Sequence, residues 1–141
     1  MSERSFHLRM TADYGHPENT IVGLLVEKNQ DGLWQDFVLS GLSPGFEIFV
    51  YSIFTCQHTY FRINAAEQGL VLASGHGEIE LGTDEDWMLD RIKVDFRARL
   101  ASGEATPEAV EYIMQRMRQC PVSKNIREPG VLQINAAFEP A

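Results

Sequence analysis

The chain has 141 residues, of which 44% are hydrophobic and 23% charged, values typical of one folded globular domain. Its formal net charge of −8 argues against a nucleic-acid backbone or an anionic membrane as a partner. Because it has no apolar stretch of the roughly 20 residues that cross a bilayer and no signal-peptide core near its start, we expect a single domain over residues 1–141 in the cytoplasm.

Three meandering strands are predicted at the start of the chain. Residues 6–12 alternate apolar Phe6, Leu8 and Met10 with polar residues, a pattern typical of a half-buried strand. Residues 20–28 and 33–42 predict two more strands, each preceded by a turn sequence, YGHPEN and NQDG.

A long apolar helix is predicted over residues 43–69. Ser43 is a suitable N-cap with Pro44 at the first helical position, and Gly69 is a suitable stop. Residues 46–54 are apolar all round, so this part of the helix needs protein on every side. One chain of this size has difficulty covering such a helix, and we expect a second subunit in a two-fold dimer.

Two strands, a helix and a last strand complete the predicted order. The strands cover residues 70–81, where the glycines of SGHGE predict a kink, and residues 88–101, where apolar and charged residues alternate. Thr106–Pro107 opens the helix, and a short helical turn, an EPG turn and a strand over 131–139 follow Cys120–Pro121. The order βββ-α-ββ-α-β indicates an α+β fold with mostly antiparallel pairing.

Cys120 stands directly before Pro121, where one helix pattern stops and a polar turn begins. With Pro121 at a first helical position, the thiol would occupy the cap of a short helix, where free N–H groups favour a reactive thiolate. The alternative is that Cys120 is a small, buried apolar residue. The position alone leaves both interpretations open.

Cys56 lies within the apolar helix, where a cysteine taken alone is more often part of the core. In a reducing compartment, however, two cysteines on different helices could meet and cycle between dithiol and disulfide. His58 follows two residues later and points away from Cys56 on a helix, so it is kept as a supporting candidate. The histidines and cysteines lack the spacing of metal ligands, and we expect no metal and no other cofactor.

These motifs together resemble the OsmC/Ohr superfamily of osmotically inducible and organic hydroperoxide resistance proteins. The resemblance covers roughly residues 33–139. It rests on the CPVS sequence after an amphipathic helix and on a cysteine halfway along the preceding apolar helix. It implies an OsmC-like, intertwined homodimer in which sheets of both subunits wrap the two central helices.

The resemblance also implies an activity. In the peroxidase branches a first cysteine attacks the hydroperoxide and becomes a sulfenic acid, and a second cysteine resolves it as a disulfide. These roles fall on Cys56 and Cys120, whereas the cap argument makes Cys120 the more acidic thiol. The implied partners are an organic hydroperoxide and an external dithiol reductant, lipoyl-type by the family pattern. An apolar approach for the substrate would be lined by Phe46, Phe49, Phe54 and Tyr60.

The sequence departs from the family where the thiol is activated. The peroxidase branches use an Arg–Glu pair, with the glutamate ten residues before the first cysteine, and Phe46 stands at that position here. Glu47 lies nine residues before Cys56, on the opposite side of an ideal helix at ~100° per residue. Arg9 and Arg4 are the candidate arginines. A second hypothesis is therefore an OsmC-like dimer that binds a small apolar or electrophilic ligand without peroxidase turnover.

Overall fold

The computed structural model describes residues 3–126 and 132–141. Its elements follow the predicted order βββ-α-ββ-α-β, and the α+β fold class is confirmed. The predicted EPG turn lies outside the described residues. The elements are β1 (Arg4–Gly15), β2 (Thr20–Gln30), β3 (Leu33–Asp36), α1 (Gly45–Glu67), β4 (Val71–Thr83), β5 (Leu89–Ser102), α2 (Pro107–Met117), a 3-10 turn (Ser123–Asn125) and β6 (Leu132–Glu139).

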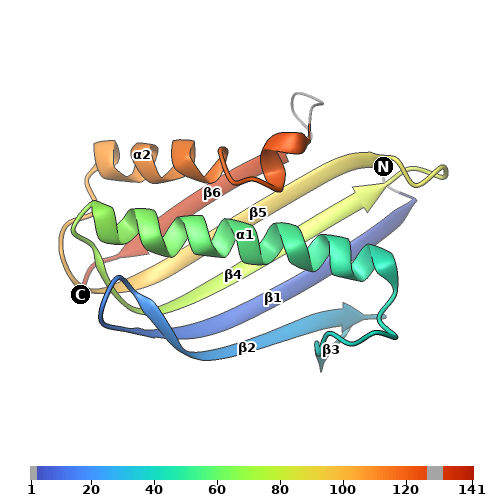
Figure 1. Ribbon diagram of the computed structural model, residues 1–141, viewed down its shortest axis with the longest axis horizontal. Helices are drawn as coiled ribbons and strands as arrows, with labels where there is room; N and C mark the ends of the chain where they lie inside the picture. The colour runs from blue at the N-terminus through green and yellow to red at the C-terminus, as the bar shows by residue number, and fades with distance from the viewer. Residues whose placement is uncertain (1–2, 127–131) are drawn as a thin grey trace.

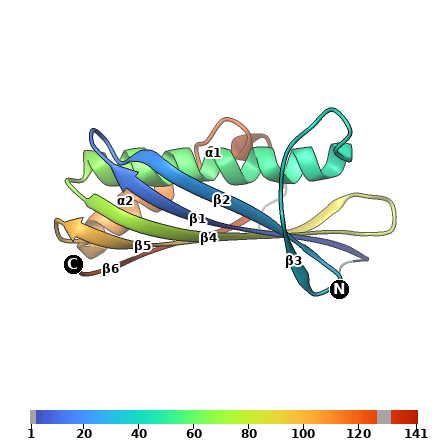
Figure 2. The same ribbon diagram turned by 90° about the horizontal axis from the view of Figure 1, so that it is seen from below.

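One sheet of six strands supports the two helices (Figure 1). Its order is β3-β2-β1-β4-β5-β6, and every neighbouring pair is antiparallel except β5 and β6, which are parallel. The crossover through α2 makes the parallel pair possible, because it returns the chain to the end of the sheet where β5 began. Figure 2 shows α1 lying along one face of the sheet. The helix packs on β1, β4 and β5, and α2 packs beside it on β6.

Helix α1 begins one residue later than predicted. Pro44 is extended and is itself the N-cap, without a side-chain hydrogen bond, so the prediction of Ser43 as N-cap is wrong. The Ser43 hydroxyl instead accepts a hydrogen bond from the backbone N–H of Ser40, at 3.1 Å. The predicted stop is confirmed, since Gly69 has φ +76° directly after the helix. Within the described part of the chain, no helix is long and apolar enough to cross a membrane.

Strand β3 is shorter than the predicted strand over 33–42. After Asp36 the chain leaves the sheet, and the side chain and carbonyl of Ser40 accept hydrogen bonds from the N–H groups of Leu42 and Ser43. Serine side chains compete in this way with strand pairing. The apolar residues of the segment nevertheless predicted a strand over its whole length. The loop leaves Val38 and Leu42 exposed, at 78% and 95%.

Phe96 on β5 is the centre of the contact between the sheet and α1. Its ring packs at 5.1–5.6 Å against three rings of the helix, those of Phe54, His58 and Phe61. Gly77 on β4 leaves the space for this ring, because a Cβ there would come within 2.5 Å of it. The strand register is unbroken from Gly75 to Gly77. The register with β5 does shift directly before these glycines, between Leu72 and Ser74. The predicted irregularity therefore lies at the start of β4, and Gly77 itself serves close packing.

We expect Gly77→Ala to lower the free energy of unfolding by about 1–3 kcal/mol, the usual cost of overpacking a core. The added methyl group would collide with the Phe96 ring, which is held by three aromatic neighbours. Gly41→Ala is the matched control, because no atom lies within 4 Å of a Cβ placed there. Urea unfolding of both variants measures the difference, and equal stabilities would contradict this packing.

Candidate active site

Cys56 lies on the flank of α1 that faces the segment after α2. Its side chain is half-buried, whereas Phe54 and His58, on the sheet side of the same helix, are fully buried. At ~100° per residue, Cys56 and His58 point in directions about 160° apart. The Cys56 thiol is therefore open to a small molecule and is not in contact with the imidazole of its own chain.

Cys120 lies in the turn between α2 and the 3-10 turn. Its backbone N–H donates to the carbonyl of Met117 at 3.2 Å, which closes the end of α2. Its side chain is fully buried, at 0% exposure. The predicted cap is wrong, because the following helical turn has only three residues and its N-cap is Val122. The N–H of Ser123 nevertheless donates to the Cys120 sulfur at 3.3 Å.

The fold brings the two thiols together. The pKa of the Cys56 thiol is raised to about 11 by burial, then by a hydrogen bond with the Cys120 side chain and by its charge, while the backbone of Val122 acts in the opposite direction. Cys120 is thus close enough to Cys56 to alter its ionisation. Among the described residues, no cation is found with the groups that shift this pKa. Both cysteines are free thiols here.

Gln57 connects α1 with the CPVS turn, residues 120–123. Its amide nitrogen Nε2 lies 2.9 Å from the Met117 carbonyl, 3.3 Å from the Cys120 sulfur and 2.7 Å from the Ser123 hydroxyl. The Cys120 thiol donates to the same hydroxyl at 2.9 Å. Gln57 is completely buried, and its Oε1 has no hydrogen-bond donor within the described residues.

His58 belongs to a second buried polar group, on the other flank of α1. Its Nε2 and the hydroxyl of Tyr14 on β1 are joined by a hydrogen bond of 2.7 Å. Burial, and secondly the charge of Arg62, lower the pKa of His58 to about 4. Burial also raises the pKa of Tyr14 well above its usual value. The predicted supporting residue is therefore a neutral core histidine that ties α1 to β1.

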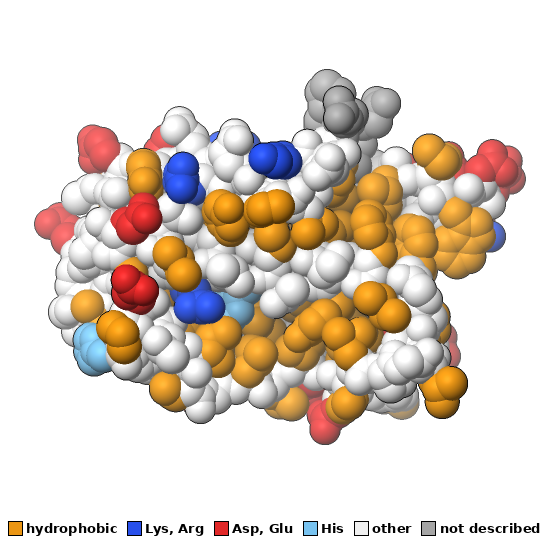
Figure 3. Space-filling model, in the orientation of Figure 1, with side chains coloured by type: hydrophobic (Ala, Val, Ile, Leu, Met, Phe, Trp, Pro, Cys, Tyr) orange, Lys and Arg blue, Asp and Glu red, His pale blue; other side chains and the backbone are white. Residues whose placement is uncertain are grey.

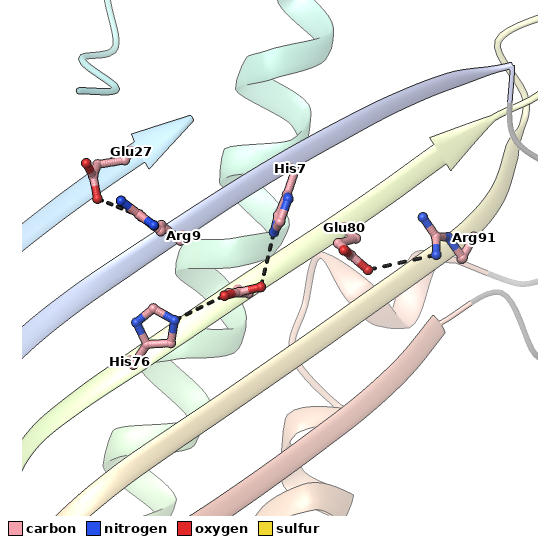
Figure 4. Close-up of polar contacts among 7 residues, drawn as sticks. His7, Arg9, Glu27, His76, Glu80 and Arg91 are labelled. Carbon is pink, nitrogen blue, oxygen red and sulfur yellow. Dashed lines mark hydrogen bonds and ion pairs between the residues drawn. The ribbon is translucent and has the colours of Figure 1, made fainter. Parts of the chain in front are cut away.

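Arg9 lies on the face of the sheet that α1 does not cover (Figure 4). Its Nε donates to Glu27 at 2.8 Å, and its guanidinium lies 4.1 Å from the ring centre of Trp34. Arg4 is bound to the carbonyl oxygens of Asp84 and Glu85 at the end of the sheet. Neither arginine can reach Cys56 of its own chain, and Arg9 as a supporting residue within one chain is wrong. The alternation in β1 had already put Arg9 on the polar face.

Glu47 forms an ion pair with a lysine instead of an arginine. Lys28 on β2 lies 3.1 Å from Glu47 Oε1. The pair lines a cleft of about 440 Å³ under the start of α1, whose other walls include Phe6, Leu8 and Val50. Nine residues of helix, at about 1.5 Å each, separate Glu47 from Cys56 by roughly 13 Å. Within one chain this ion pair does not touch the thiols.

A family model described as "OsmC-like protein" matches residues 39–135 of the 141 in the chain. The match includes α1, both cysteines and the CPVS turn. The chain belongs to the OsmC-like protein family. No match was found among curated proteins.

Solved structures share the OsmC-like fold at low sequence identity. The OsmC-like protein of Mycoplasma pneumoniae is 12% identical, with 83% of this chain and 89% of that one covered and a TM-score of 0.52. An OsmC-like hydroperoxide resistance protein from Jannaschia sp. is 11% identical, with 89% of each chain covered and a TM-score of 0.55. A hypothetical protein from Aquifex aeolicus is 14% identical, with 93% and 96% covered and a TM-score of 0.54.

The four aromatic residues predicted to line one pocket are dispersed in this OsmC-like chain. Phe46 and Phe49 pack together at the start of α1, where Phe46 also meets Phe6 and Trp87. Phe54 is part of the core against Phe96, and Tyr60 lines a separate hollow of about 220 Å³ beside α2. The prediction of a single pocket is wrong, because residues along 15 positions of a helix point to different sides and span roughly 20 Å.

Gln57 and Ser123 are the residues of this site that the sequence analysis missed. The available signal for Gln57 was an uncharged amide next to Cys56 inside a segment otherwise rich in apolar residues. A polar side chain on a buried helix needs a partner, and the nearest candidate was the second cysteine motif. Nothing in the local pattern identified that partner.

The buried histidine predicts a pH dependence of stability. The unfolded chain binds a proton near pH 6.5 at His58, whereas the folded chain does so only near pH 4. The free energy of unfolding therefore falls as the pH drops through this window, by about 3 kcal/mol from a pKa difference of about 2.5 at 1.36 kcal/mol each. Urea unfolding between pH 7 and pH 4 should show this loss in wild type and not in His58→Gln. Tyr14→Phe, which leaves the histidine buried, should retain the slope, and identical pH profiles for wild type and His58→Gln would contradict the assignment.

Proposed function

We propose that this OsmC-like chain is a thiol-dependent peroxidase that reduces organic hydroperoxides through Cys56 and Cys120. The observation that supports it best is the approach of Cys120 to the helix turn that carries Cys56: Gln57, the residue after Cys56, lies 3.3 Å from the Cys120 sulfur, and Cys120 is among the groups that shift the pKa of Cys56. Family membership supports a peroxide-related role, and the similar structure from Jannaschia sp. is named a hydroperoxide resistance protein.

The proposed cycle has three balanced steps. The Cys56 thiolate attacks the outer oxygen of the hydroperoxide, the O–O bond breaks, and an alcohol leaves once its oxygen takes up a proton. The Cys120 thiolate then attacks the Cys56 sulfenic acid, and water leaves as the disulfide forms. An external dithiol, lipoyl-type by the family pattern, reduces the disulfide through a mixed disulfide.

Accessibility supports this division of roles. Cys56 is half-buried and can be reached by a peroxide, whereas Cys120 is completely buried behind it. A buried resolving thiol needs no contact with the substrate, only with the first sulfur. We therefore assign the first attack to Cys56 because it is the more exposed thiol. The hydrogen-bond donors that would stabilise a thiolate lie instead around Cys120.

The raised pKa of Cys56 favours a second function. With a pKa of about 11, only about one thiol in 10⁴ is ionised at pH 7, and the thiolate is the reactive form. A chain that kept this value in its assembly would suit the binding of a small apolar or electrophilic ligand without peroxidase turnover. For a peroxidase, a cation from outside the described residues, in this chain or in a second subunit, must lower the pKa.

A two-fold dimer is the assembly we propose. Apolar side chains gather on the face that carries the helices and toward the end where α1 begins (Figure 3). Those exposed there include Val38, Leu42, Ile48, Trp87 and Met88, at 40–95%. Such a surface is typical of a protein interface, and a second subunit would cover the part of α1 that the sheet leaves open.

Titration of free thiols against cumene hydroperoxide tests the peroxidase. We expect wild type to lose two thiols per chain rapidly, Cys120→Ser to stop at one oxidised thiol, and Cys56→Ser to react no faster than a free thiol. A Cys56 pKa well below 11 should accompany the rapid reaction. Oxidation of wild type at the rate of a free thiol would refute the peroxidase and leave the ligand-binding function.

Analytical ultracentrifugation tests the dimer. We expect wild type to sediment as a dimer at micromolar concentration and the double variant Leu42→Glu/Ile48→Glu as a monomer, because two carboxylates would be buried in the interface. Lys93→Glu, on the polar face of β5, is the matched control and should remain a dimer. A monomeric wild type would contradict the proposal.

A further inference from the structure

The amide of Gln57 is the one side-chain nitrogen of α1, among the described residues, that contacts the Cys120 sulfur. It holds both ends of the segment around the thiol, through the Met117 carbonyl before it and the Ser123 hydroxyl after it. We propose that Gln57 is a positioning residue for Cys120, which it holds against α1 and stabilises as the thiolate that closes the disulfide; this rests on the proposed peroxidase function.

The hydrogen bonds around Cys120 suit an anionic sulfur better than a neutral one. The sulfur accepts from Gln57 Nε2 and from the Ser123 N–H, both at 3.3 Å. In the neutral form the thiol donates to the Ser123 hydroxyl. After ionisation that hydroxyl can turn and donate in the opposite direction, since it is both donor and acceptor. Three donors then surround the charge, and hydrogen bonds to an ion are the stronger kind.

The bonding of Gln57 is also unusual for a purely structural residue. Two N–H hydrogens are shared among three acceptors, and Oε1 is buried without a donor among the described residues. A buried acceptor left unpaired is costly. The amide nitrogen is therefore directed toward the CPVS turn, while the amide oxygen is left without a donor among the described residues. The adjacent residue on α1 is Cys56, so the same helix turn presents one sulfur and holds the other.

The step that depends on Gln57 is the closure of the disulfide. The Cys120 thiolate supplies the electron pair for the new S–S bond, the S–O bond of the Cys56 sulfenic acid breaks, and the hydroxide takes up a proton and leaves as water. The preceding attack on the hydroperoxide involves only Cys56. Loss of the amide should therefore slow the second step far more than the first, in which Cys120 acts only through its effect on the ionisation of Cys56.

Two substitutions and one control separate this role from packing. Gln57→Met keeps the length and removes the donors, and Gln57→Glu keeps the shape but replaces the amide nitrogen with oxygen. The control is Asn64→Leu, which also removes a buried amide from α1. Asn64 bonds to the Tyr60 carbonyl and Arg116 and does not contact the CPVS turn. Circular dichroism and unfolding midpoints verify that each variant is folded.

The first measurement is the ultraviolet absorbance of the thiolate against pH in a Cys56→Ser background. We expect the Cys120 midpoint to rise by about one to two pH units in Gln57→Met, the equivalent of one lost hydrogen bond to an ion. It should rise further in Gln57→Glu, where an ionised carboxylate faces the sulfur, and remain unchanged in Asn64→Leu. A midpoint in Gln57→Met equal to that of Asn64→Leu would overturn the proposal.

The second measurement follows a single turnover with cumene hydroperoxide, with dimedone as the trap for sulfenic acid. We expect the rate of sulfenic acid formation to change little in Gln57→Met and the disulfide to close about ten- to a hundredfold more slowly. Closure as fast as in Asn64→Leu would overturn the role in catalysis. Absence of sulfenic acid in Cys120→Ser, where no second thiol can consume it, would refute the peroxidase instead, and the titration would still decide whether Gln57 stabilises the Cys120 thiolate.

Discussion

The ring of Phe96 is the contact on which the position of α1 depends. Three rings of the helix, from Phe54, His58 and Phe61, meet it from one side at i, i+4 and i+7 spacing. This contact sets the rotation of the helix about its axis. With the rotation set, Gln57 faces the CPVS turn, and Cys56 lies at the edge of the helix surface where that turn crosses it.

Buried polar groups then make this position unique. Tyr14 and His58 lock one flank of α1 to β1, and Gln57 locks the other flank to the segment that contains Cys120. A shift of the helix by one turn would leave both groups unpaired in the interior, where unpaired polar atoms are costly. The apolar contacts supply the attraction, while the polar ones select a single register for the two sulfur atoms.

Within the described residues, one chain brings the thiols together and leaves the first of them without a charge partner. The apolar loop before α1 and the rings around Phe46 remain partly exposed, and Glu47 is neutralised by Lys28 far along the helix from Cys56. Among the described residues, α1 thus lacks cover at its start, and Cys56 lacks a neighbouring cation. The proposed dimer, by covering α1, would change both the burial and the electric field at Cys56, and would thereby link oligomeric state to thiol chemistry.

Local spacing in the sequence was sufficient to predict the element order, the Thr106 cap of α2 and the two cysteines on separate elements, because propensity, capping and periodicity act over a few residues. Local spacing was not sufficient where residues distant in the sequence determine the structure. It did not reveal that Gly77 makes room for the ring of Phe96, and it wrongly predicted a single aromatic pocket. The resemblance of the motifs to the OsmC/Ohr superfamily also predicted the family that the comparison confirms. Only the tertiary structure decided that Gln57 holds the second thiol, because a hydrogen bond between residues 57 and 120 depends on how α1 and α2 pack, which no local pattern encodes.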